Sequence, residues 1–183
     1  MPDDNMPDEQ GTYVARNALV IAQTLCAAPV KDRAETRRMG PEGSAFFWRM
    51  AARLDIPATD EAKWLVFTRL CALLTPSSAT SSFHDPSRPF GAVLADGGDA
   101  RARLDQPAVS EARLARLLAA RGDARLTALE RAVRAIARDA RAMDAPSLAW
   151  AVINPDGQQI ARAYYRRLDG GPVTLKTSIP ETE

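Results

Sequence analysis

The amino-acid sequence predicts an all-α fold, a two-lobed helical bundle of about seven to nine helices with no significant sheet. In one segment after another, apolar residues recur at intervals of three and four, the spacing of an amphipathic helix. Prolines, glycines and serines separate these segments, and such residues interrupt helices. The one β-like run, residues 173–179, stands alone. A chain of 183 residues is long enough to bury a core, as one domain or as two small lobes.

Five helices are expected in the first half of the chain. Pro29 interrupts the apolar pattern of the first one, and Pro76 follows the fourth, which Thr59 or Asp60 can cap. A serine- and proline-rich loop, residues 75–89, precedes the fifth. The expected helices cover residues 12–28, 31–39, 44–54, 60–74 and 90–96.

Four more helices are expected in the second half. Ser110 is suited to cap the first of them and Gly122 to end it. Pro146 and Pro155 lie near the starts of the last two, where proline is tolerated. The expected helices cover residues 111–121, 123–143, 147–153 and 156–168. All three tryptophans lie in apolar helical runs, so we expect a core position for each: Trp48, Trp64 and Trp150.

The sequence divides into four regions. Both ends are polar and are expected to be loosely held, and the glycine turn after residue 95 separates two helical lobes. The expected regions are an acidic flexible N-terminus at 1–10, an N-terminal lobe at 11–95, a C-terminal lobe at 96–168 and a loose C-terminal tail at 169–183.

The composition is that of a soluble globular protein, and we expect it in the cytoplasm. No run of about 18 apolar residues is present, and the acidic start of the chain does not have the pattern of a signal peptide. Cys26 and Cys71 each lie in an apolar helical pattern. We therefore expect two free thiols rather than a disulfide.

The formal net charge of +1 hides a basic body. Residues 1–10 and 169–183 together carry seven acidic residues and one lysine. Without them the chain has 23 basic and 16 acidic residues, a difference of +7. Of the 24 basic residues, 21 are arginines, which bind phosphate in a bidentate manner that lysine does not allow.

The sequence does not favour an enzyme, a cofactor site or a metal site. His84 is the only histidine, and its neighbours Ser82 and Asp85 lie on the same loop, whereas catalytic triads draw on separate elements. We therefore interpret His84 as a loop residue making a polar contact. A phosphate-binding glycine loop, a nucleophile elbow and zinc-ligand spacing are all missing from the sequence.

Arginines cluster on the polar sides of several expected helices. At about 100° per residue, the four arginines between positions 131 and 141 fall within about 80° of one another, opposite the apolar side of their helix. Glu130 and Asp139 are expected to pair with arginines of the same helix. Because like charges at this density repel one another, they favour a polyanion as the ligand. No aromatic side chains are interleaved with these arginines to stack on bases, so contacts with phosphate groups are favoured. The candidate nucleic-acid contacts are Arg33, Arg37, Arg38, Arg101, Arg113, Arg116, Arg131, Arg134, Arg138 and Arg141.

Two other interpretations stay open at this point. An arginine row is most often a solvated face, and it can also dock an acidic protein surface, which would make the chain a helical adaptor. A helix-turn-helix regulator fits less well, because the helix at 123–143 is longer than that motif needs.

An ordered set of short motifs resembles a known family. The resemblance runs from about residue 33 to 168, and the order of the motifs carries it, since each motif is short and helical. They read, in order, RAETRRMGPEGSAFFWRM, WLVFTRLCALL, FGAVLAD, SEARLARLLAA, LERAVRAIA, DAPSLAWAV and IARAYYRRL. This set resembles the CasB family, the small subunit of the type I-E CRISPR surveillance complex Cascade.

The resemblance implies an all-α, two-lobed, non-catalytic protein of the antiviral defence system. It implies two copies in the complex, associated with each other and with the backbone and large subunits. It also implies contact with the guide RNA–target DNA duplex and the displaced strand. The family's basic positions match Arg37, Arg38, Arg113 and Arg131. One position departs from the family pattern, because Ala92 follows Gly91 where the family tends to have arginine.

Overall fold

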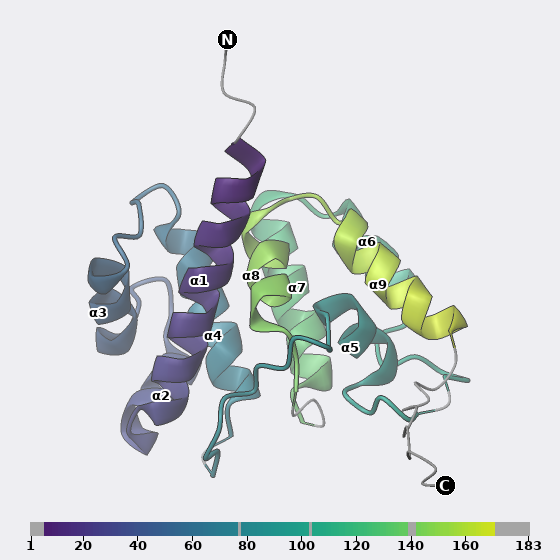
Figure 1. Ribbon diagram of the computed structural model, residues 1–183, viewed down its shortest axis with the longest axis horizontal. Coiled ribbons are helices and arrows are strands. Elements are labelled where there is room, and N and C mark those ends of the chain that lie inside the picture. The colour runs from purple at the N-terminus through teal and green to yellow at the C-terminus, as the bar shows by residue number, and fades with distance from the viewer. Residues whose placement is uncertain (1–5, 77, 103, 139–141, 171–183) are drawn as a thin grey trace, which may run out of the picture.

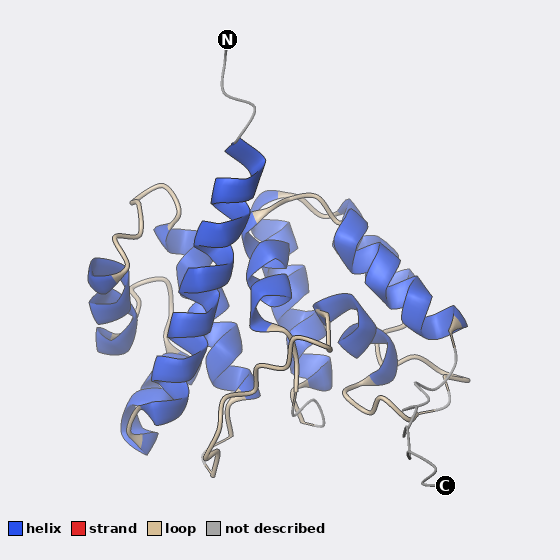
Figure 2. Cartoon of the chain, viewed as in Figure 1, coloured by secondary structure: helices blue, strands red, loops and turns tan. Residues whose placement is uncertain are grey.

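The computed structural model describes residues 6–76, 78–102, 104–138 and 142–170, which form nine α-helices and no strand (Figures 1 and 2). The all-α prediction is therefore confirmed. No helix in these ranges is long and apolar enough to cross a membrane. Asp139, Arg141, residues 1–5 and residues 171–183, which include the β-like run at 173–179, lie outside the described residues. The helices are α1 Met6–Ala27, α2 Val30–Arg38, α3 Ala45–Arg53, α4 Glu61–Leu74, α5 Phe90–Asp96, α6 Glu111–Ala119, α7 Gly122–Ile136, α8 Ala145–Ile153 and α9 Gln158–Asp169.

Helix α4 lies at the centre of the bundle. Nine of its 14 residues are buried, and it packs against α1, α2, α3, α7 and α8. Trp64 is completely buried, and its ring meets those of Tyr13 and Phe67 edge to face at 6.3 and 5.5 Å. The apolar residues of α4 surround the whole helix because other helices cover it on several sides.

Helices from the two ends of the sequence share this core. Helix α8 packs against α1 and α4, so a late segment lies beside the first one (Figure 1). One buried apolar cluster runs from Val14 to Tyr164. The expected division into lobes at residues 95 and 96 stays a prediction, and contacts between α1 and α8 and between α5 and α9 cross it.

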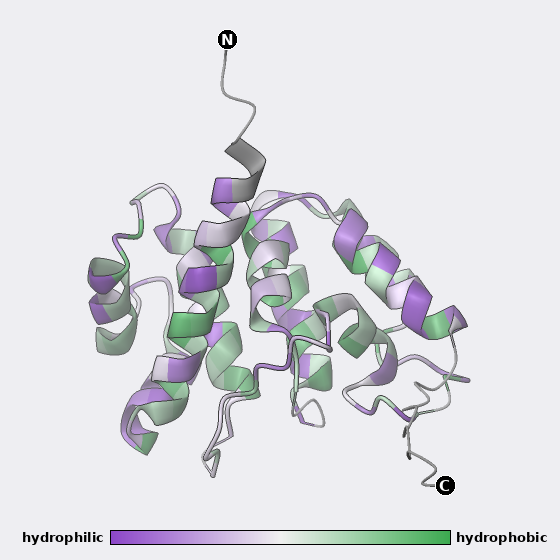
Figure 3. Ribbon diagram, viewed as in Figure 1, coloured by the Kyte–Doolittle hydropathy of each residue, from purple (hydrophilic) through white to green (hydrophobic). Residues whose placement is uncertain are grey.

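Helices α5 and α9 approach each other very closely. A Cβ atom on Gly91 would overlap the carbonyl oxygen of Ile160 and would lie 2.9 Å from the Cβ of Ala163. Hydrophilic and hydrophobic bands alternate along α9 in Figure 3, as expected for a helix with one buried face. Glycine at position 91 therefore sets the distance between the two backbones.

A buried ion triad joins the same region. Arg88 donates two hydrogen bonds to the carboxylate of Asp96, at 2.7 and 3.0 Å, and Arg167 of α9 donates a third at 2.7 Å. The side chain of Asp96 is completely buried. Arg167 also donates to the carbonyl oxygens of residues 99, 100 and 102. The triad thus ties the loop before α5, the end of α5 and α9 together.

Helix α7 is shorter than the sequence predicts. The expected helix covers residues 123–143, whereas α7 ends at Ile136 and the described residues 142 and 143 are not helical. Met143 instead pairs with the loop before α5, where its N–H donates to the Phe83 carbonyl and its carbonyl accepts from Asp85. This long-range pairing overrides local helix propensity.

Trp48 is not in the core, contrary to the prediction. Its side chain is 44% exposed on α3, while Trp64 is buried and Trp150 is partly buried against the core. The indole N–H donates to the carbonyl oxygen of Glu42 at 2.9 Å, and the ring lies against Phe47. Phe46, Phe47 and Met50 cover the core side of the short helix, which turns the next aromatic residue outward.

Candidate functional site

A hollow between α6 and α7 gathers three of the expected arginines. Arg113 and Arg116 come from α6 and Arg131 comes from α7, and all three side chains are exposed. The hollow has a volume of about 350 Å³. Its remaining lining is small and apolar: Val109, Leu117, Ala128, Ala132 and Ala135.

The amphipathic patterns of the two helices create this arrangement. On one side of α6 the buried residues are Leu114 and Leu117. On one side of α7 they are Leu129, Val133 and Ile136. The helices pack together along these sides. Arginines on the flanks then meet over the seam, and the alanines beneath them are too small to fill it.

The three guanidinium groups carry uncompensated charge. Within the described part of the chain, none of them has a hydrogen-bond or ion-pair partner, and no carboxylate lines the hollow. Glu111, the acidic residue that begins α6, instead accepts a hydrogen bond from Tyr165 of α9. Like charges held this close raise the local positive potential and attract an anion.

Arg134 is bound to a carboxylate of its own helix. Glu130 accepts two hydrogen bonds from Arg134, at 2.8 and 3.1 Å, which confirms the pairing expected from their spacing. The other carboxylate oxygen of Glu130 accepts from Arg69 of α4, which also donates to the Met39 carbonyl. Arg134 therefore belongs to the arginine row of residues 131, 134 and 138, but its charge is neutralised by the ion pair with Glu130.

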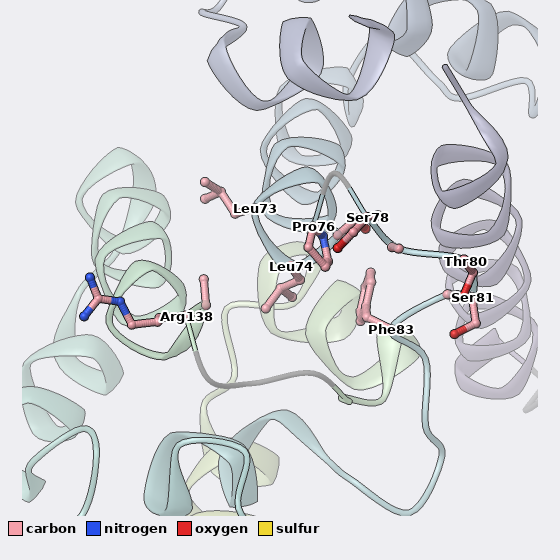
Figure 4. Close-up of a pocket in the computed structure, with 12 residues that line it drawn as sticks. Leu73, Leu74, Pro76, Ser78, Thr80, Ser81, Phe83 and Arg138 are labelled. Carbon is pink, nitrogen blue, oxygen red and sulfur yellow. The ribbon is translucent and has the colours of Figure 1, made fainter. Parts of the chain in front are cut away.

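Arg138 lies beyond the last turn of α7, beside a second hollow (Figure 4). The loop after α4 forms the opposite wall of this hollow, which has a volume of about 410 Å³. Arg138 is exposed and extends outward, away from that wall. Arg101 and Arg38 are also exposed, the first in the turn after α5 and the second at the end of α2.

Arg33 and Arg37 hold the interior of the protein together. Arg33 is 6% exposed and donates to the carbonyl oxygens of Cys26, Pro76 and Ala79. Arg37 donates to those of Ala72 and Thr75, at 3.0 and 2.9 Å. The structure therefore does not bring these two candidates together with the arginines of α6 and α7. We assign them a structural role, in which they hold α2 to the end of α4 and to the loop that follows it.

Arg125 is a structural arginine within α7. It is 3% exposed, and it donates to the carbonyl oxygens of Leu117, Ala151 and Asn154 at 3.3 to 3.5 Å. Burial, with a smaller contribution from Arg121, lowers the pKa of its guanidinium below the usual value. It joins the ends of α6 and α8 to α7 and so fixes the seam on which the first hollow depends.

His84 makes structural contacts. Its Nδ1 accepts a hydrogen bond from the Ala145 N–H at 3.2 Å and lies 3.6 Å from the carboxylate of Asp144. Asp144 caps α8 by accepting from the Ser147 N–H. Among the described residues, no three histidine, cysteine or acidic side chains come together as metal ligands.

The fold and the site define a helical-bundle protein with an arginine-rich surface. Residues 32–167, about three quarters of the chain, match the family model of the CRISPR-associated protein Cse2. The chain belongs to this family, which is also called CasB. Its members are structural subunits of the type I-E CRISPR complex Cascade. No curated protein and no solved structure matches the chain.

Proposed function

We propose that this chain is a non-catalytic Cascade subunit that binds the phosphate backbone of nucleic acid. Two copies lie together in the complex, beside its backbone and large subunits. They contact the guide RNA–target DNA duplex and the displaced DNA strand, and so stabilise the R-loop in antiviral defence. Since the guide RNA reads the sequence, a small subunit needs only contacts that ignore the bases.

One observation carries this proposal: the hollow between α6 and α7 holds three arginines and no carboxylate. Guanidinium groups without protein partners are free to bind phosphate oxygens in a bidentate manner. An acidic protein surface would also attract them, but the two ligands differ in salt dependence. Each phosphate contact on a single strand contributes about −0.7 to the slope of log K against log salt.

The test replaces Arg113 and Arg131 together with glutamine in the full-length chain. The matched control replaces Arg49 and Arg53, which are also exposed but lie on α3, a helix that does not line the hollow. Fluorescence anisotropy then measures binding to labelled strands of about twelve nucleotides and to their duplexes. Measurements at about 50 and 200 mM salt give the slope.

We expect Arg113→Gln with Arg131→Gln to weaken binding by at least about tenfold, since each charged hydrogen bond contributes about 1.5 kcal/mol or more. The slope should become shallower by about 1.4 for a single strand because two contacts are lost. The α3 control should bind as the wild type does. Equal losses in both variants, or no salt-sensitive binding by the wild type, would contradict the proposal.

A change at Glu130 should act in the opposite direction. Glu130→Gln removes the carboxylate that neutralises Arg134 and Arg69, so a further guanidinium becomes available for phosphate. We expect tighter binding, by roughly threefold to tenfold, and a slope steeper by about 0.7 on a single strand. The same anisotropy titrations measure both quantities. Unchanged affinity in a variant with a wild-type circular dichroism spectrum would show that Arg134 takes no part in binding.

A further inference from the structure

The second hollow lies at the C-terminal end of α7. Ala137 and Arg138 form one side of it, and the loop between Leu74 and Phe83 forms the other. In Figure 4 the side chains of Leu74, Pro76, Ser78 and Phe83 gather on the loop side, across from the end of α7. Its volume of about 410 Å³ is in the range of sites that accept small organic groups.

The lining combines apolar carbon with free hydroxyl groups. Leu73, Leu74, Pro76 and Phe83 supply the apolar part. The hydroxyls of Thr75 and Ser82 are engaged, the first with the Cys71 carbonyl and the second with the His84 N–H. Three more hydroxyls line the hollow without a partner among the described residues: Ser78, Thr80 and Ser81. Such a lining can accept a flat group that has an apolar face and a polar edge able to form hydrogen bonds.

The loop that forms this wall is held in place from behind. Arg33 donates to the carbonyl oxygens of Pro76 and Ala79, and Arg37 donates to that of Thr75. The Thr75 hydroxyl secures the start of the loop to α4. Because two arginines bind the backbone carbonyls of residues 75, 76 and 79, the hollow is formed before any ligand arrives, which lowers the entropic cost of binding.

The arginine row connects the two hollows. Arg131 lines the first hollow and Arg138 lines the second, with Arg134 between them. At a rise of about 1.5 Å per residue, α7 advances about 7.5 Å from Arg131 to its last residue, Ile136, and Arg138 follows two residues later. A nucleic-acid strand advances about 3.4 Å per nucleotide in a helix, so about two nucleotides cover the helical part of this distance.

We propose that the second hollow receives an unpaired nucleobase of a strand whose backbone lies on the arginines of α6 and α7. The inference rests on the proposed function and specifies its ligand as a single strand. The base lies against the apolar wall, and the hydroxyls of Ser78 and Thr80 bond to its polar edge. A base within a duplex is paired and stacked, and extruding it costs a few kcal/mol, so duplexes bind less well.

The test uses the full-length chain and two labelled oligonucleotides of equal length, one of thymidines and one with abasic residues. The variant Ser78→Leu with Thr80→Leu narrows the hollow and removes two hydroxyls at exposed positions. The matched control, Ala58→Leu with Thr59→Leu, adds side chains of the same kind at exposed positions of the loop before α4. Anisotropy titrations give the dissociation constants.

We expect the wild type to bind the thymidine strand about tenfold more tightly than the abasic strand, because a contact between a base and a protein surface contributes about 1–3 kcal/mol. The hollow variant should bind both strands with the affinity of the abasic one, whereas the loop control should keep the preference. A wild type that binds the two strands equally overturns the inference, and this outcome does not depend on any variant folding.

The remaining outcomes separate this inference from the proposed function. Salt-sensitive binding that Arg113→Gln with Arg131→Gln abolishes, without any preference for bases, refutes the inference and leaves the proposed function standing. Absence of binding to either strand refutes both. If thymidine monophosphate displaces the strand at an equal concentration of nucleotides, the hollow is a site for free nucleotides, which also overturns the inference.

Discussion

Replacing Asp96 with alanine is expected to destabilise the protein by about 3–5 kcal/mol, because the change leaves two buried guanidinium groups without their carboxylate. Arg88 and Arg167 both donate to Asp96, and the Asp96 side chain is completely buried. Arg167 retains its carbonyl acceptors, but Arg88 loses both ion-pair hydrogen bonds. Since domains of this size are stable by only about 5–15 kcal/mol, the midpoint of urea unfolding should fall substantially.

Asp99 provides the matched control for this experiment. It is an exposed aspartate in the turn after α5, and among the described residues its carboxylate accepts one hydrogen bond, from the backbone N–H of Arg101. Asp99→Ala should cost about 1 kcal/mol or less. Replacing the whole triad with apolar residues of similar volume, as in Arg88→Met, Asp96→Leu and Arg167→Met together, should restore much of the lost stability. If Asp96→Ala and Asp99→Ala lowered the free energy of unfolding equally, the buried triad would contribute no more to stability than an exposed turn residue does.

Gly91→Ala is expected to destabilise the protein by about 2–3 kcal/mol, although alanine is the better helix former. The added methyl group would overlap the backbone carbonyl of Ile160 and press on Ala163. Neither the backbone atoms nor the short side chain can move aside cheaply, and overpacking of this kind costs about 1–3 kcal/mol or more. The gain in helix propensity is only about 1 kcal/mol and does not offset it. Urea unfolding with a constant m value would measure the difference.

The same substitution elsewhere should have the opposite sign. Gly11 lies inside α1, and a Cβ atom there would meet no atom within 4 Å. Gly11→Ala should therefore stabilise the protein by up to about 1 kcal/mol through helix propensity alone. If both substitutions changed stability in the same direction, the close approach of α5 and α9 would not be the reason for glycine at position 91.

Local sequence patterns predicted most of the secondary structure and part of the site, although not the end of α7. In the part of the chain that the structure describes, the helices follow from apolar periodicity and from prolines and glycines near their ends, since these signals act within a few residues. The patterns also placed Arg113, Arg116 and Arg131 correctly on exposed sides, because amphipathic helices bury the opposite side. They could not show that these three arginines meet over one seam, which depends on how α6 and α7 pack.

Arginine itself is the residue whose role the sequence could not assign. Arg33 and Arg113 belong to similar basic clusters, yet Arg33 is buried among carbonyl oxygens and Arg113 is exposed. A guanidinium with five donors satisfies buried carbonyls as well as it binds phosphate, so its surroundings decide its function. Arg88 and Arg167 are further examples, because their carboxylate partner is distant from Arg167 in the sequence.

The sequence by itself determined the helical class, the family and the excess of arginine on exposed faces, because periodicity, motif order and charge are local properties of the chain. Only the tertiary structure decided which arginines brace the interior and which remain available, where α7 ends, and that Trp48 is exposed. These outcomes depend on contacts between residues far apart in the sequence, such as Met143 with Phe83 and Arg37 with Thr75. Burial is a property of the packed molecule, and it decides whether an arginine binds backbone carbonyls in the interior or remains exposed to a ligand.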